Sequence, residues 1–367
     1  MRSCKNTPKI NPYFENLSSH FMASYPFFLD KLGLVEKYSR KIDMGKSLSP
    51  KDSDMFRIEE ICEKCIVKKY YQLGNIIWPD NMEHRISDHH LYPSEYFINA
   101  ILNIQIINDY MINPPIILDP SMIKYFRYIP LHHNKLMILD ALMKQGSHPR
   151  YEYNLRYVYS EHYGVLTIKD FAIDNIIVST DGRIDSRDDN IILPTNNNLM
   201  KEHEYLFHTH PNSSTIAGRM DEGVIYEFPS ANDIRNFVKH HYDGRVQASL
   251  IISPEGIYVI RPIIFGFRPK ISSDFFHSLE KFILKLEKLA IKKFDSFRPL
   301  INDPNFFHPK VGQNFRYIEL YNRYIHSANL FVEYYPRKKK NGEWCLDSIN
   351  LPYVNKFNFL PKLYRYE

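Results

Sequence analysis

The spacing of apolar residues predicts a mainly helical segment at the start of the chain. Apolar positions recur at helical intervals in residues 27–41 and 53–73, and Cys62 and Cys65 lie on the apolar stripe of the second stretch. A Cys-x-x-Cys pair is typical of redox and zinc sites, but no second pair follows at zinc-finger spacing, which favours core cysteines. The pattern then turns polar, and we predict a helical N-terminal extension over residues 1–92.

The middle of the chain alternates between strand and helix patterns. The predicted strands are residues 116–118, 157–168, 172–178, 190–193, 248–252 and 257–261, and the predicted helices are residues 94–109, 119–128, 131–145 and a long amphipathic helix from Ser273 or Asp274. Short turns between neighbouring strands favour antiparallel pairing. We expect an α+β domain over residues 93–298, with a mixed, largely antiparallel sheet flanked by helices.

A small α/β extension is predicted over residues 299–367. Residues 317–324 have helical spacing, and residues 330–335 and 342–346 have the pattern of a hairpin. The basic run 337–340 lies at the predicted turn. A solvated turn is the simpler interpretation, and a nuclear-import signal or a patch for an acidic partner is the alternative.

Two histidines follow a short apolar run within the α+β domain. His208 and His210 come directly after residues 205–207 and before Pro211, which is the pattern of a short buried strand that ends at a site. Side chains alternate along a strand, so the two imidazoles should point to the same face. A His-x-His pair alone is more often a coincidence than a metal site, and a further ligand is needed.

Asp233 is the candidate for that further ligand. Ser230 fits the N-cap of a helix, and Asp233 would then lie in the first helical turn. Ser-x-x-Asp alone is usually only a cap. Combined with the histidine pair, it predicts one zinc ion per chain bound by His208, His210 and Asp233, with a fourth position open for water.

In this order, the residues resemble the motif of the JAMM/MPN+ (JAB/MPN/Mov34) metalloprotease family, namely an upstream Glu, His-x-His-Pro and Ser-x-x-Asp. The resemblance implies an MPN-like fold with a curved sheet, the zinc ligands named above, a glutamate as general base and Ser230 as a hydrogen-bond donor to the oxyanion. The family usually has a shorter spacing between Pro and Ser than the eighteen residues 212–229 found here. We interpret this insertion as a flap over the substrate tail, with a passive surface excursion as the alternative.

Two glutamates precede the histidines and compete for the role of general base. Glu204 has the strand parity of His208, but four residues at roughly 3.3 Å each place it about 13 Å away along the strand. Glu161 begins a Glu-x-x-Gly-x-Leu stretch that resembles the family pattern, at the edge of a predicted strand. A neighbouring strand can bring Glu161 within reach, so we predict Glu161 as the base. An exposed charge at a strand end is the alternative.

The resemblance implies a zinc-dependent isopeptidase or peptidase that acts at the C-terminal tail of ubiquitin or a ubiquitin-like protein. The alternative is an MPN scaffold with weak catalysis that binds partner proteins, although scaffolds of this family typically lack metal ligands that this chain keeps. A zinc deaminase would need His-x-Glu followed by Pro-Cys-x-x-Cys, which the chain does not have.

Composition narrows the setting but not the chemistry. The 367 residues carry a net charge of +5, which is too small to predict nucleic-acid binding. Four cysteines do not resemble a disulfide framework, and neither a signal sequence nor a membrane-spanning apolar run is evident. We expect a soluble intracellular protein, cytoplasmic or nuclear, without a membrane partner. The richness in Ile, Asn, Lys and Tyr favours an AT-rich genome, and similar JAMM proteins of large DNA viruses make a viral source, in a host cell or virion, the expectation.

Overall fold

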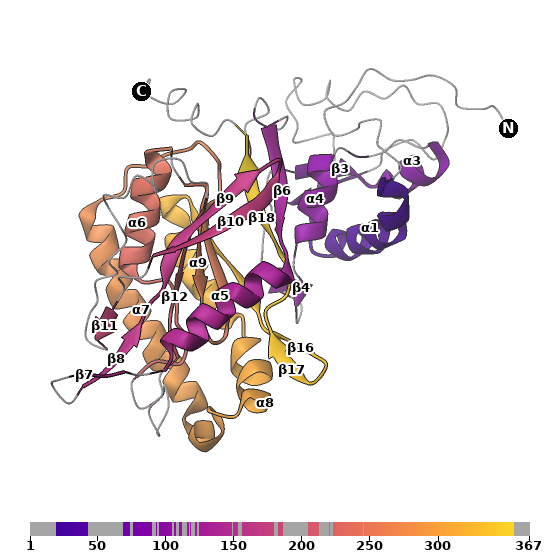
Figure 1. Ribbon diagram of the computed structural model, residues 1–367. Coiled ribbons are helices and arrows are strands. Elements are labelled where there is room, and N and C mark those ends of the chain that lie inside the picture. Colours follow the sequence, from indigo (N-terminus) through magenta and orange to yellow (C-terminus); the bar gives the residue numbers. More distant parts are fainter. Residues whose placement is uncertain are drawn as a thin grey trace. The chain divides into compact units, whose positions relative to one another are not determined.

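The chain is mixed α and β and divides into two compact units, Met1–Arg127 and Tyr128–Glu367. The computed structural model (Figure 1) describes residues 20–42, most of 69–152, 156–179, 183–185, 205–212, 220 and 223–355 except 245. Within these residues there are eight α-helices, and the strands pair mainly antiparallel. The predicted α+β class is therefore confirmed at this level.

The first unit combines a three-stranded antiparallel sheet, β1-β2-β3, with helices. Its elements are α1 (His20–Glu36), β1 (Arg40–Ile42), β2 (Tyr70–Leu73), β3 (Ile76–Pro79), α3 (Met82–His89), α4 (Glu95–Asn103), β4 (Ile106–Ile107) and β5 (Tyr110–Met111). The ring of Trp78 packs edge-on against that of Phe97 at 5.7 Å, and its Nε1 donates a hydrogen bond to Glu36. Burial of these large rings joins α1, β3 and α4.

A six-stranded sheet forms the centre of the second unit, in the order β10-β9-β12-β13-β14-β15. Its neighbouring strands are antiparallel except β12 and β13, which are parallel. The elements are β6 (Phe126–Leu131), α5 (His133–Gly146), β7 (Arg150–Glu152), β8 (Arg156–Ser160), β9 (Tyr163–Lys169), β10 (Ala172–Ser179), β11 (Arg183–Asp185), β12 (Tyr205–Thr209), α6 (Ala231–Tyr242), β13 (Ala248–Ile252), β14 (Gly256–Pro262), α7 (Ser273–Phe294), η5 (Asp295–Leu300), α8 (Pro304–Phe307), η6 (His308–Gly312), α9 (Arg316–Ile325), η7 (His326–Ala328), β15 (Leu330–Pro336), β16 (Lys338–Lys340), β17 (Glu343–Cys345) and β18 (Ile349–Val354).

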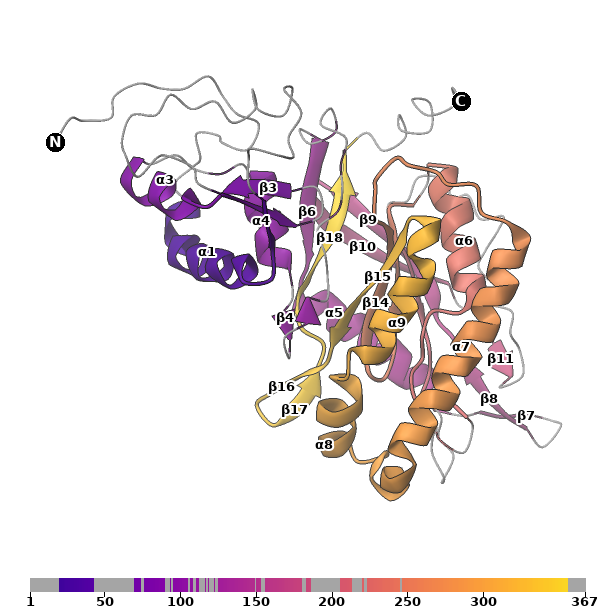
Figure 2. The ribbon, with the colours of Figure 1, turned by 180° about the vertical axis from the view of Figure 1, so that it is seen from behind.

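Helices cover both faces of this sheet. Helix α5 lies on one face, and α6, α7 and α9 lie on the other (Figures 1 and 2). Tyr205 and Phe207 of β12 pack in one apolar cluster with Leu136 and Leu139 of α5. Each such side chain contributes roughly 1.5–3 kcal/mol when fully buried. Because side chains alternate along a strand, His208 lies on the opposite face, toward α6.

Most of the predicted elements in the second unit are present, including α5, β10, β13, β14, α7 and α9. Several predictions are wrong in part, and the predicted helices 27–41 and 94–109 are shorter, because β1 and β4 occupy their ends. Residues 70–73 and 126–131 form strands rather than helix ends, because pairing with β3 and with β18 outweighs the apolar spacing. The predicted strand 157–168 is two strands, β8 and β9, separated by Glu161 and His162.

The tail predicted as a separate extension is part of the central sheet, because β15 pairs along its whole length with β14. The hairpin partner of β17 is β16 rather than residues 330–335. The basic run is also divided, since Arg337 is buried and donates to Asp140, whereas the three lysines of β16 are exposed.

The unit boundary after Arg127 differs from the predicted one after residue 92. The predictions for Cys62, Cys65, Glu204 and residues 190–193 lie outside the described residues.

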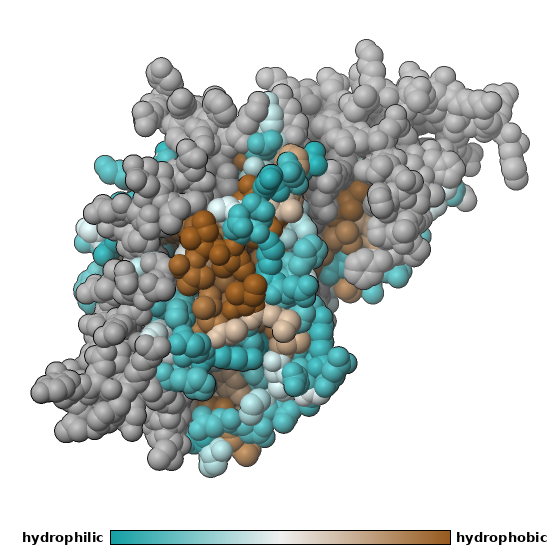
Figure 3. Space-filling view, in the orientation of Figure 1, coloured by the Kyte–Doolittle hydropathy of each residue, from teal (hydrophilic) through white to brown (hydrophobic). Residues whose placement is uncertain are grey.

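Large apolar side chains are exposed over α5 and β10. Figure 3 shows this patch, and its exposed members include Met137, Ile138 and Val178. In the part of the chain that the structure describes, no helix has the length and apolar character needed to cross a membrane.

Candidate metal site

Strand β12 carries the first histidine, and the second follows directly after it. β12 lies between β9 and β13 and is buried along its whole length. The His210 N–H donates to the carbonyl of Ile252 at 2.9 Å, which continues the pairing with β13 one step beyond the strand. The ring centroids of His208 and His210 are 5.0 Å apart. The two imidazoles therefore converge on the α6 face, as the alternation predicts.

The N-terminus of α6 brings the third candidate ligand to the same place. Ser230 is the N-cap, and its Oγ accepts from the Asp233 N–H at 3.1 Å. In return, Oδ2 of Asp233 accepts from the Ser230 N–H at 2.7 Å, which completes a capping box. The hydrogen bond from the Ser230 N–H fixes the Asp233 carboxylate, with Oδ1 near His208 and Oδ2 near His210.

The three side chains have the spacing of metal ligands. Nε2 of His208 is 3.1 Å from Nε2 of His210 and 3.1 Å from Oδ1 of Asp233. Tetrahedral ligand atoms bound to zinc at about 2.0–2.1 Å lie roughly 3.3 Å from one another. Oδ1 of Asp233 is buried without a well-aligned hydrogen-bond donor, which leaves a lone pair for a cation. This buried group could hold a metal ion.

Hydrogen bonding, burial and neighbouring charges set the charges of His210 and Asp233. Nδ1 of His210 is 3.3 Å from the carbonyl oxygen of Glu227, and a proton donated there leaves the lone pair on Nε2. Burial and the neighbouring His208 lower the pKa of His210 to about 4, so the ring is neutral at pH 7. Burial alone would raise the pKa of Asp233, but the two histidines lower it below its ordinary value and the carboxylate stays ionised.

Glu161 lies beside these ligands, in the connection between β8 and β9. It is two residues before Tyr163, which is paired with His208 across β9 and β12. Its Oε2 is buried and has no hydrogen-bond partner. Burial raises the pKa of Glu161 to about 8; His208 opposes this shift, whereas the carboxylates of Asp233 and Glu227 add to it. A dication nearby would favour the ionised form and lower this pKa, so Glu161 becomes a base only in a metal-loaded site.

Two hydrogen bonds fasten the Glu161 connection to β12. The Thr209 N–H donates to the carbonyl of His162 at 2.8 Å, and the His162 N–H donates to Oγ1 of Thr209 at 2.9 Å. Only glycine fits at position 164, in the stretch that resembles the family motif, because a Cβ there would lie 1.9 Å from the Ile177 carbonyl oxygen. The position of Glu161 thus follows from the close packing of β9 between β10 and β12.

The last part of the insertion is packed into the second unit. Its buried residues are Ile225, Tyr226, Phe228 and Pro229. Side chains of Glu255, Glu287 and Tyr321 hydrogen-bond to its backbone. The flap hypothesis is therefore wrong for residues 225–229, and residues 213–219, 221 and 222 lie outside the described part of the chain.

Sequence reasoning missed three glutamates near the ligands. Oε2 of Glu227 is 3.9 Å from Nδ1 of His210, and Glu255 and Glu287 are buried carboxyls that contact the segment around Glu227. Glu287 had a signal, because it falls on the buried face of α7 beside Leu286. An acidic residue on an apolar helix face indicates a buried polar partner.

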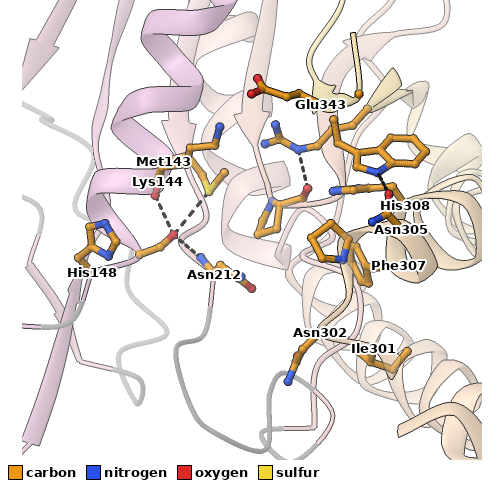
Figure 4. A pocket seen from close by; sticks show the side chains of 16 residues that line it. Met143, Lys144, His148, Asn212, Ile301, Asn302, Asn305, Phe307, His308 and Glu343 are labelled. Carbon is orange, nitrogen blue, oxygen red and sulfur yellow. Dashed lines mark hydrogen bonds between the residues drawn. The ribbon is translucent and has the colours of Figure 1, made fainter. Parts of the chain in front are cut away.

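A cavity of about 890 Å³ is lined in part by Asn212, which follows the second histidine, His210, by two residues. Figure 4 shows Asn212, two residues after His210, beside the end of α5, where its N–H donates to Oγ of Ser147 at 2.7 Å. The opposite wall includes His308 and Trp344, whose rings are 4.9 Å apart. The cavity offers space for part of a ligand beside Asn212.

The stability of the metal-free protein should depend on pH through Glu287. Burial raises the pKa of Glu287 to about 8 from an ordinary 4.5, so the folded chain keeps a proton that the unfolded chain loses between these values. Stability therefore falls as the pH rises through this range. In Glu287→Gln the contribution of Glu287 to this fall is absent, and the unfolding free energy of the variant relative to the wild type should increase by roughly 2–4 kcal/mol from pH 5 to pH 8. Urea unfolding of both proteins measures this; a pH-independent difference would show that Glu287 is ionised in the fold.

A mimivirus protein aligns with almost the whole chain. The chain is 51% identical over 351 residues to Uncharacterized protein R413 of Acanthamoeba polyphaga mimivirus, and the alignment covers 94% of this chain and 98% of that protein. No family model matches the chain. No solved structure matches it significantly. The extent of the identity shows that the chain belongs to the family of this mimivirus protein.

Proposed function

We propose that the chain is a zinc-dependent isopeptidase or peptidase of JAMM type. The observation that carries the proposal is the buried convergence of His208, His210 and Asp233, with the buried Oε2 of Glu161 beside them. Two imidazoles and one carboxylate form a ligand set that suits zinc and leaves a position open. Structural zinc sites instead use four protein ligands, so three ligands and a glutamate favour catalysis.

The arrangement of the second unit supports an MPN-like fold for this chain. Its central sheet is mixed but mainly antiparallel, with one parallel pair between β12 and β13. Helices lie on both faces, and the candidate site is at the end of β12, where α6 begins. These features agree with the flanked, largely antiparallel sheet that the sequence motif implies.

In the proposed reaction a water molecule attacks the carbonyl carbon of an amide or isopeptide bond. A bound zinc ion would act as a Lewis acid and make that water more acidic. Glu161 accepts the proton of the water and later passes it to the leaving amine. The Ser230 hydroxyl accepts the Asp233 N–H, so its own proton is available to donate to the developing oxyanion. No covalent intermediate with the protein forms.

The proposed substrate is ubiquitin or a ubiquitin-like protein, cleaved at its C-terminal tail. This assignment follows from the resemblance of the motif to JAMM proteases. The mimivirus relative supports an action inside a host cell. One zinc ion per chain is expected.

Metal content and cleavage of the full-length protein test this proposal. We expect elemental analysis to find one zinc ion per purified chain, and a panel of ubiquitin dimers of all linkages to contain at least one that is cleaved in a zinc-dependent way. Chelation should stop cleavage, and added zinc should restore it. Zinc without cleavage of any dimer would contradict the substrate class, and the absence of zinc would favour the scaffold alternative.

A further inference from the structure

Segment 225–229 ends the insertion just before the N-cap of α6, and it is held by side chains from α7, from α9 and from the turn between β13 and β14. The Ile225 N–H donates to Oε2 of Glu287 at 2.9 Å, and the Glu227 N–H donates to Oε1 of Glu255 at 2.6 Å. The Tyr321 hydroxyl donates to the carbonyl of Pro229 at 2.8 Å. The backbone of this segment is thus fixed from both sides of Glu227.

This segment contacts the candidate metal site through Glu227, whose backbone carbonyl and side chain both lie near Nδ1 of His210. The carbonyl oxygen of Glu227 is 3.3 Å from Nδ1 of His210 and fixes which imidazole nitrogen faces Asp233. Partners of this kind orient metal-binding histidines, and their loss typically reduces metal affinity 10–100-fold. A displacement of the segment would therefore leave the His210 ring free to turn.

We propose that Glu287 of α7 is a positioning residue for the metal site, which it acts on by holding segment 225–229 against His210. The inference rests on the metal site of the proposed function, but not on the reaction or its substrate. It concerns a residue 62 positions beyond Ile225, on a different element.

The surroundings of Glu287 argue against a role in packing alone. The side chain is only 6% exposed, its Oε1 has no hydrogen-bond partner, and its hydrogen bonds come from the backbone of Ile225 and Tyr226. Burial of a carboxyl without a basic partner is unfavourable unless the carboxyl is protonated. Leucine would pack on the apolar face of α7 without that penalty but could not accept an N–H. The acceptor oxygen is therefore the feature that distinguishes glutamate at this position.

Two variants separate the acceptor oxygen from the carboxyl charge. Glu287→Gln keeps an oxygen in the same place, and Glu287→Leu removes it. We expect Glu287→Leu to bind zinc 10–100-fold more weakly than the wild type in competition with a chelator, and Glu287→Gln to remain within about threefold. The visible absorption of the cobalt-loaded protein should change in the leucine variant only, because it reports ligand geometry.

Asn322→Leu is the matched control. Asn322 of α9 is likewise buried, and its side chain hydrogen-bonds to the backbone of Val332. Val332 belongs to β15, which is the edge strand of the central sheet and is not adjacent to β12. Asn322→Leu should lower the unfolding midpoint without changing zinc affinity. The inference is overturned if Glu287→Leu binds zinc within threefold of the wild type, if Glu287→Gln binds as weakly as Glu287→Leu, or if Asn322→Leu loses affinity to the same extent.

Amide hydrogen exchange of the metal-free proteins distinguishes failure of this inference from failure of the proposed function. The amides of residues 225–227 should exchange at least 10-fold faster in Glu287→Leu than in the wild type or in Glu287→Gln. A wild type that binds no zinc refutes the metal site, while faster exchange in the leucine variant would still establish that Glu287 holds the segment. Unchanged exchange in the leucine variant refutes the positioning role whatever the metal content.

Discussion

Asparagine in place of Asp233 is expected to weaken zinc binding by roughly 10³-fold or more while α6 stays folded. Asp233 uses its two oxygens for different tasks, since Oδ2 accepts the Ser230 N–H in the capping box and Oδ1 faces His208. Asparagine has one oxygen. If that oxygen keeps the cap, the amide NH₂ group faces the cation, and if it turns to the cation, the cap is lost. In both cases the site also loses its one negative charge among the three ligands.

Competition with a chelator measures the loss in Asp233→Asn, and circular dichroism checks that the helix content is kept. Asp140→Asn is the matched control, because Asp140 is a buried carboxylate of the same unit that pairs with Arg337 and Lys144. The control should be less stable but bind zinc like the wild type. Zinc affinity of Asp233→Asn within 10-fold of the wild type would show that Asp233 is not a ligand.

The ligands could be predicted from the sequence because their geometry is local. The alternation of side chains along a strand places His208 and His210 on one face, whatever the neighbouring strands are. The distance from Ser230 to Asp233 is likewise that of a capping box, which needs only the first turn of a helix. The tertiary fold decides whether the histidine pair and Asp233 come close together. Their proximity was inferred because the two motifs occur in the same order in a known family.

The surroundings of the ligands depend on contacts that are distant in sequence. Glu161 reaches the site because β9 pairs with β12, which places Tyr163 opposite His208. No periodicity in either strand specifies that pairing. Glu287 comes still later in the chain, and its single signal was an acidic residue on an apolar helix face. The insertion shows the same limit, since its length relative to the family motif suggested a flap although residues 225–229 are packed against buried side chains.

The sequence prediction was wrong where the spacing of apolar residues favours a helix but pairing with a distant strand produces a strand. Residues 70–73 continue an apolar helical pattern, but Tyr70 and Tyr71 favour extended structure and pair with β3. Residues 126–128 were predicted as the end of the helix 119–128, yet they belong to β6, which pairs with β18 from the far end of the chain. Both strands are stabilised by partners that a short window of sequence does not contain.

Glutamine in place of Glu161 is expected to reduce turnover by roughly 10³-fold and to leave zinc affinity within about threefold of the wild type. Glutamine has nearly the same shape, so the packing of the connection between β8 and β9 is kept. It cannot accept a proton, so the attacking water keeps its proton and the leaving amine receives none. Because the buried carboxyl is protonated in the metal-free protein, neutralising it should not destabilise that state.

Zinc content and cleavage of the same ubiquitin dimer, measured side by side, separate the base from a ligand. Glu333→Gln is the matched control, since Glu333 is a buried carboxylate on β15 that pairs with Arg261 at the opposite edge of the sheet from β10. Its turnover per folded molecule should equal that of the wild type. Turnover of Glu161→Gln within threefold of the wild type would assign the base elsewhere. If Glu161→Gln loses both its zinc and its turnover, Glu161 is a metal ligand, because a residue that acts only as a base does not bind the cation.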